Sequence, residues 1–66
     1  MTIDIDTLDL SNLVAGVAVQ GEDILLMLPT RRFSKERALV VAAWMVALTG
    51  VDEADFVRLL HRVYNT

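Results

Sequence analysis

The sequence predicts an α+β fold, in which a β-hairpin with a candidate third antiparallel strand is followed by two α-helices. Apolar side chains alternate in the first third of the chain, and the last half carries helix caps ahead of helical segments. With 66 residues and no cysteine, the chain forms one small domain (1–66), near the size at which a single core barely offsets chain entropy. We therefore expect a partner, most simply a second copy of the chain.

The strand-rich part covers residues 1–30. We expect one strand over Val14–Gln20 and another over Asp23–Leu28, because Gly21-Glu22 between them can supply a two-residue turn. In that register Val17 lies opposite Leu26, and Val19 lies opposite Ile24. Both faces of this hairpin are apolar, so the sequence allows it to be covered on two sides.

The candidate third strand is the N-terminal segment, where Ile3 and Ile5 alternate with Asp4 and Asp6. Leu8 and Leu10 fall in the opposite phase, so this segment needs a bulge or a turn near residues 6–7.

The two helices are expected over residues 34–49 and 52–64. Ser34 and Asp52 are good N-cap residues, and Gly50 suits the left-handed conformation that ends the first helix. Pro29 is a natural end for the preceding strand. The second helix carries an apolar stripe that we expect to be buried, made of Phe56, Leu59, Leu60 and Val63.

The first helix contains eleven consecutive residues, 38–48, without a polar side chain. Its faces differ in size rather than polarity. The bulky face, expected to pack on the hairpin, consists of Val40, Val41, Trp44, Met45 and Leu48. The opposite face is rich in alanine, which permits close approach of the second helix or of another subunit. We call it the small-residue face, and its candidate oligomer-interface residues are Leu39, Ala42, Ala43, Val46 and Ala47.

A basic cluster lies at the start of the first helix and contains Arg31, Arg32, Lys35 and Arg37. Helix N-terminal amides together with cationic side chains can hold a phosphate or a carboxylate, so the cluster is a candidate anion or partner site. The alternative is that these residues pair with the acidic N-terminal third or keep the surface solvated, which is the commoner role of a charge run.

Composition argues against several other functions. The net charge is −3 and the pI about 4.7, and the second helix opens with acidic residues that would repel nucleic-acid phosphates. His61 has no nucleophile placed by a motif, and neither a metal cluster nor a cofactor motif is present, so we expect no enzyme activity, metal or cofactor. The apolar run is too short for a membrane span, and the acidic N-terminus is unlike a signal peptide, so we expect a cytoplasmic location.

One resemblance bears on origin. The segments Phe33–Leu39 and Ala42–Leu48, with the ending Val63-Tyr64-Asn65-Thr66, resemble small proteins encoded by bacteriophages of mycobacteria and related actinobacteria. It covers about the last half of the chain. The resemblance implies a phage origin and action in the host bacterial cytoplasm, but it implies no catalytic or binding residue.

These observations favour a non-enzymatic, homo-oligomeric protein-interaction module that binds itself, as a homodimer or larger assembly, and a host or phage protein. The first alternative is an anion or nucleic-acid binder working through the basic cluster. The second is a membrane-active small protein that uses the apolar helix.

Overall fold

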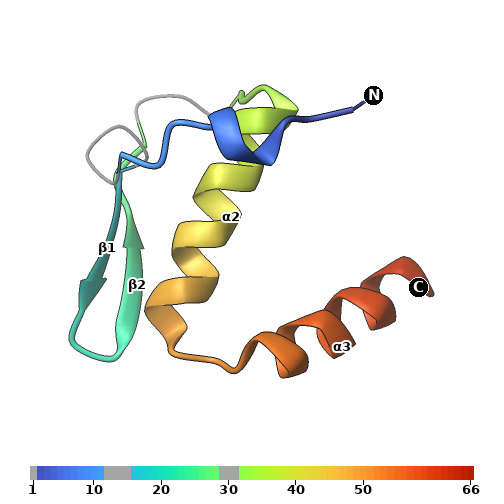
Figure 1. The fold of residues 1–66 in the computed structure, drawn as a ribbon. Helices are drawn as coiled ribbons and strands as arrows, with labels where there is room; N and C mark the ends of the chain where they lie inside the picture. Colours follow the sequence, from blue (N-terminus) through green and yellow to red (C-terminus); the bar gives the residue numbers. More distant parts are fainter. Residues whose placement is uncertain (1, 12–15, 29–31) are drawn as a thin grey trace.

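The fold is the expected hairpin followed by two helices. In the computed structural model, which describes residues 2–11, 16–28 and 32–66, strands β1 (Val17–Gln20) and β2 (Asp23–Leu26) precede helices α2 (Lys35–Thr49) and α3 (Glu53–Tyr64). The hairpin lies along one side of α2. Helix α3 follows the C-terminal end of α2 and runs away from the hairpin (Figure 1). The α+β prediction is confirmed.

The hairpin register is the one that the sequence predicts. Val17 pairs with Leu26, and Val19 pairs with Ile24, in an antiparallel two-stranded sheet. Gly21 adopts a φ of 62°, a left-handed conformation that glycine takes without the steric cost of a side chain. Both strands are shorter than expected, and the predicted start at Val14 lies outside the described residues.

The candidate third strand is not formed. Residues Ile5–Thr7 make a single 3-10 turn, η1, and none of the described residues before Val17 belongs to a strand. Asp4 explains the difference, because its carboxylate accepts a hydrogen bond from the backbone N–H of Asp6 at 3.2 Å. Its carbonyl oxygen also accepts one from the backbone N–H of Thr7 at 3.3 Å. An aspartate that bonds its own local backbone favours a turn over an extended strand.

Both helix caps form as predicted. The Ser34 hydroxyl accepts a hydrogen bond from the Arg37 amide at 3.1 Å, and the Asp52 carboxylate accepts one from the Ala54 amide at 3.0 Å. Gly50 ends α2 with a φ of 72°. Each of these features depends only on neighbours in the sequence, which is why the helix boundaries could be predicted closely.

The core lies between the hairpin and the bulky face of α2. Val17 is 1% exposed and packs against Val41, and partly buried apolar side chains surround this pair: Ile24, Leu28, Trp44, Met45 and Leu48. The core assignment of Trp44 and Met45 is therefore confirmed. Val40 is also buried, but it lies in the part of α2 that lines hollows together with the N-terminal segment.

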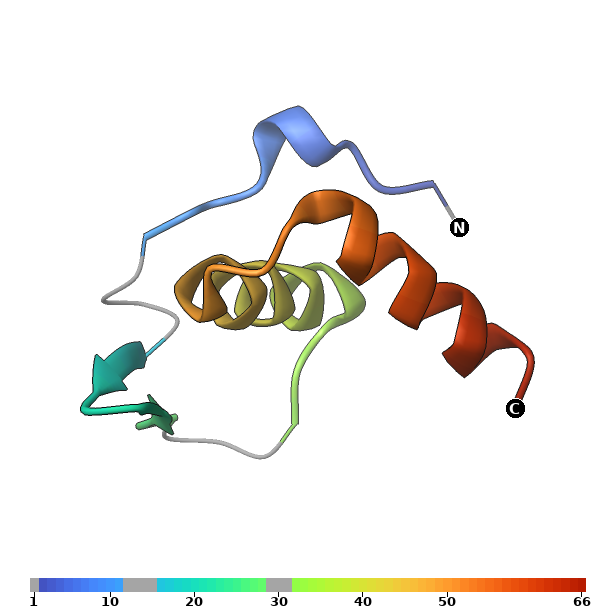
Figure 2. The same ribbon diagram turned by 90° about the horizontal axis from the view of Figure 1, so that it is seen from below.

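The N-terminal segment is anchored to α2 by a tryptophan. The indole N–H of Trp44 donates a 2.9 Å hydrogen bond to the carbonyl oxygen of Leu10. This places residues 5–10 beside α2, on a different side from the hairpin (Figure 2). Within the described part of the chain, no helix is long and apolar enough to cross a membrane.

Candidate interaction surface

Helix α3 is amphipathic, but it does not bury its apolar stripe within the chain. Leu59 is 50% exposed and Val63 is 61% exposed, while Phe56 and Leu60 are half-buried. No residue of α3 is fully buried. The expectation that these four residues are buried is therefore wrong for a single chain, because α3 points away from α2 (Figures 1 and 2).

The small-residue face of α2 is exposed as well. Ala42, Ala43 and Ala47 are exposed, Leu39 is 43% exposed, and Val46 is half-buried. Neither the hairpin nor α3 covers this face. The sequence left two alternatives open, the second helix of the same chain or another subunit, and α3 of the same chain does not pack on it. These five residues lie on one side of α2, where the N-terminal segment is a neighbour of Leu39, Ala43 and Ala47 but leaves them accessible.

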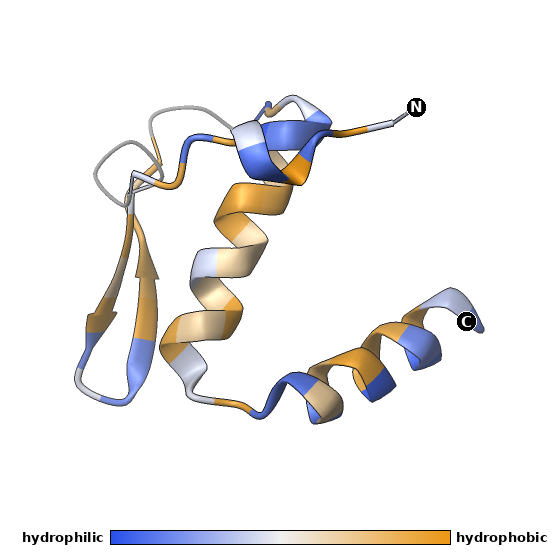
Figure 3. Cartoon of the chain, in the orientation of Figure 1, coloured by the Kyte–Doolittle hydropathy of each residue, from blue (hydrophilic) through white to orange (hydrophobic). Residues whose placement is uncertain are grey.

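Two apolar hollows flank this face. One lies at the junction of α2 and α3, has a volume of about 420 Å³, and is lined by Ile24, Met45, Val46, Thr49, Val51, Asp55, Phe56 and Leu59. The other, of about 410 Å³, lies between the N-terminal segment and α2 and is lined in part by Ile5, Leu10, Leu39 and Ala43. Apolar residues occur on the N-terminal segment, along α2 and on α3 (Figure 3), and both hollows are lined mainly by such residues.

The far face of the hairpin adds to this surface. Met27 is 61% exposed and Leu25 is 37% exposed, so α2 covers only one side of the sheet. The sequence pattern predicts that both hairpin faces are apolar, but it does not indicate that the second face lacks a cover.

The described members of the basic cluster are Arg32, Lys35 and Arg37. Lys35 and Arg32 are exposed, and of the described members only Arg37 lines the hollow of about 170 Å³ at the N-terminus of α2. Arg32 makes an interaction of its own. Arg31 lies outside the described residues.

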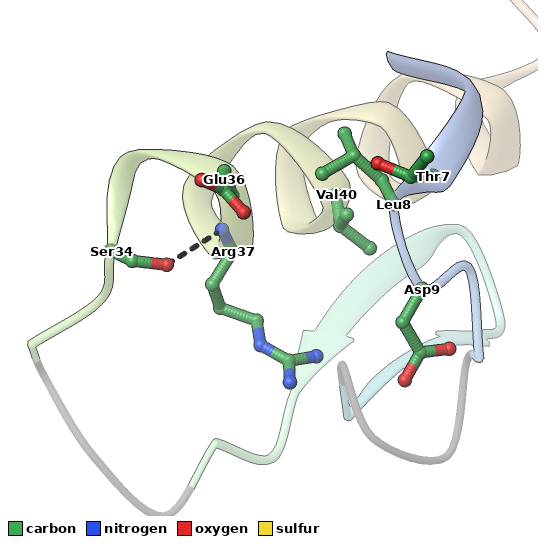
Figure 4. A pocket seen from close by; sticks show the side chains of 7 residues that line it. All are labelled: Thr7, Leu8, Asp9, Ser34, Glu36, Arg37 and Val40. Atoms are coloured by element: carbon green, nitrogen blue, oxygen red, sulfur yellow. Dashed lines mark hydrogen bonds between the residues drawn. The ribbon is translucent and has the colours of Figure 1, made fainter. Parts of the chain in front are cut away.

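Arg37 itself is half-buried, and its Nη1 atom is buried without a hydrogen-bond partner. Its guanidinium and the carboxylate of Asp9 reach into the same hollow from two different segments, and Glu36 also lines it (Figure 4). Two carboxylates in so small a space oppose the entry of an anion. The geometry therefore supports an interaction surface better than an anion site.

No protein-family model, curated protein or solved structure matches this chain. The resemblance to phage-encoded proteins stays a prediction.

Proposed function

We propose that this protein is a small protein-interaction module that assembles as a homodimer and binds a further protein as a phage-type accessory factor. The observation that carries the proposal is the amount of surface that one chain leaves uncovered. Its accessible area is 5705 Å². A compact monomer of 7.3 kDa is expected to expose about 4,200 Å².

The excess, about 1,500 Å² per chain, is of the size that an obligate homodimer buries on each subunit. The chain is also more extended than a compact domain. Its radius of gyration is 12.8 Å, whereas about 11 Å is expected for this length. Large apolar side chains are exposed on the N-terminal segment, the hairpin and α3, and this supports association rather than solvation.

The small-residue face provides the test. Light scattering at micromolar concentration should give a mass near twice 7.3 kDa for the wild type. Ala43→Asp places a charge on this face and should shift the mass toward the monomer, because an unpaired carboxylate is costly to desolvate at an interface. The matched control is Ala54→Asp, which adds the same charge to an exposed alanine of α3 on the side opposite its apolar stripe. A wild type that runs as a clean monomer would contradict the proposal.

The same variants test the further partner. Pull-down from a mycobacterial lysate should recover a protein with the wild type and with Ala54→Asp but lose it with Ala43→Asp. Equal recovery with both variants would show that partner binding requires neither the homodimer nor the small-residue face.

A further inference from the structure

The position of α3 indicates how a second copy of the chain binds. Helix α3 carries its exposed apolar stripe on one side, and the hollow at the α2–α3 junction begins at the same stripe, with Phe56 and Leu59 on its wall. A second helix packed against α3 would both cover the apolar stripe of α3 and occupy part of this hollow. The chain's own α3 cannot do this, because it forms one wall of the hollow.

The charges at the two ends of α3 favour a second α3 helix in the antiparallel direction. The first turn of α3 carries Glu53 and Asp55, and its last turn carries His61 and Arg62. In a parallel pair of α3 helices the like charges would lie side by side. In an antiparallel pair each acidic first turn lies beside a basic last turn, and the helix dipoles also oppose each other favourably.

Helical spacing identifies the two side chains that meet. Along α3 the apolar stripe spans Phe56 to Val63, and Asp55 and Arg62 are seven residues apart on the same flank of that stripe. In an antiparallel pair related by a two-fold axis, residues on the same flank of the two helices face each other. Asp55 of one copy then meets Arg62 of the other, twice per dimer.

Among the described residues, no strong contact within one chain occupies the side chains of Asp55 and Arg62. Asp55 contacts Arg58 of the same helix at 3.3 Å, but both side chains are largely exposed, at 61% and 82%, so the contact is weak and leaves the carboxylate accessible. None of the ion pairs or hydrogen bonds seen in the described residues involves the side chain of Arg62.

We propose that two copies of this chain pair through antiparallel α3 helices, with Asp55 of each facing Arg62 of the other, and with the C-terminal half of each α3 lying at the partner's α2–α3 hollow. This inference rests on the proposed homodimer and assigns the geometry of its α3 contact, which adjoins the small-residue face at Val46. It places Val63 of one copy near Phe56 of the other, so the most exposed end of the apolar stripe becomes covered.

A charge exchange tests the pairing. Asp55→Arg alone sets arginine against arginine across the dimer, and Arg62→Asp alone sets aspartate against aspartate, so each variant should dimerise about tenfold more weakly than the wild type. Mixed one to one, the two variants restore both opposite-charge contacts. About nine-tenths of the dimers should then be mixed, against half for random pairing.

Native mass spectrometry reads the result, because the two variants differ in mass. The two variants carry net charges of about −1 and −5, because each reversal changes the net charge of −3 by two, and this difference by itself favours mixed dimers slightly. A mixture of Glu22→Arg with Lys35→Asp has the same net charges at exposed positions outside α3 and measures that general effect. Glu22→Arg is the matched control for Asp55→Arg. It makes the same charge change at the exposed hairpin turn and should leave dimerisation unchanged.

The outcomes separate this geometry from the proposed function. A wild-type dimer with random mixing of the two variants would overturn the antiparallel pairing while leaving the homodimer intact. A wild type that is monomeric would overturn both. If a variant alone has lost helical content and the one-to-one mixture regains it, the result supports the pairing, because the partner variant then restores the helix.

Discussion

At the scale of single residues, Gly16 has the strictest requirement. Its φ is +67°, and its carbonyl oxygen accepts a 2.7 Å hydrogen bond from the Met27 amide, which continues the hairpin beyond β1 and β2. A Cβ atom at this position would lie 2.6 Å from the Met27 carbonyl oxygen. The two backbones can approach this closely only because one side chain is absent.

Gly16→Ala should therefore destabilise the fold by about 2 kcal/mol, through the left-handed conformation and the backbone clash together. Urea unfolding measures the change. The control is Gly21→Ala, which has a similar φ of +62° but nothing within 4 Å of its added Cβ, and should cost about 1 kcal/mol. Equal losses for the two variants would show that the clash is relieved by a small shift of the hairpin.

Two residues, Trp44 and Arg37, make or lack contacts that the sequence could not predict. The pattern predicted that Trp44 belongs to the core, because it lies on the bulky face of an apolar helix. It could not predict that the indole N–H bonds the Leu10 carbonyl oxygen, since that contact joins positions 34 residues apart. Nor could it reveal the buried, unpaired Nη1 of Arg37, which depends on where the N-terminal segment lies.

At the scale of elements, features governed by local chemistry were predictable, and those governed by tertiary packing were not. The caps of α2 and α3, the hairpin turn and its register follow from neighbouring residues and are confirmed. The N-terminal strand failed because a local aspartate turn competes with it. The burial of α3 failed because amphipathicity shows that a helix needs a partner, but not which chain supplies it.

Helix α3 should depend on its cap more than α2 does. It has 12 residues and none is fully buried, whereas α2 has 15 and is fixed by Val40 and Val41. A helix of this length is marginal without packing. Asp52→Ala removes a cap worth about 1 kcal/mol, so in dilute solution it should reduce the circular dichroism signal at 222 nm measurably.

Ser34→Ala is the comparison, because it removes the equivalent cap from α2. It should lower the unfolding free energy by a similar amount, about 1 kcal/mol, while leaving the helical signal of the folded state nearly unchanged. Asp52→Asn keeps an oxygen that can accept the Ala54 amide and should retain most of the signal. If both alanine variants lose the same helicity, α3 is held by contacts within the chain.

At the scale of the whole molecule, stability and association should be the same process. One chain buries three apolar residues among those described, all valines, and only Val17 is fully buried, so the core offsets little chain entropy. Further apolar side chains that could enlarge the core are exposed on the N-terminal segment, the hairpin and α3. Dimerisation then adds to the folding free energy by mass action, so the melting temperature must depend on protein concentration.

For a dimer that unfolds directly to two separate chains, each tenfold increase in concentration adds about 1.4 kcal/mol per dimer, which corresponds to a rise of about 5 °C in melting temperature for two chains of this length. Thermal denaturation at 1, 10 and 100 micromolar would measure it, with Ala43→Asp as the comparison. That variant should melt at a lower temperature and show less dependence on concentration, because its folded state is less often a dimer. A wild-type melting temperature that does not change over the range would mean that the core around Val17 and Val41 is sufficient, and that the exposed apolar surface serves a different protein rather than a second copy.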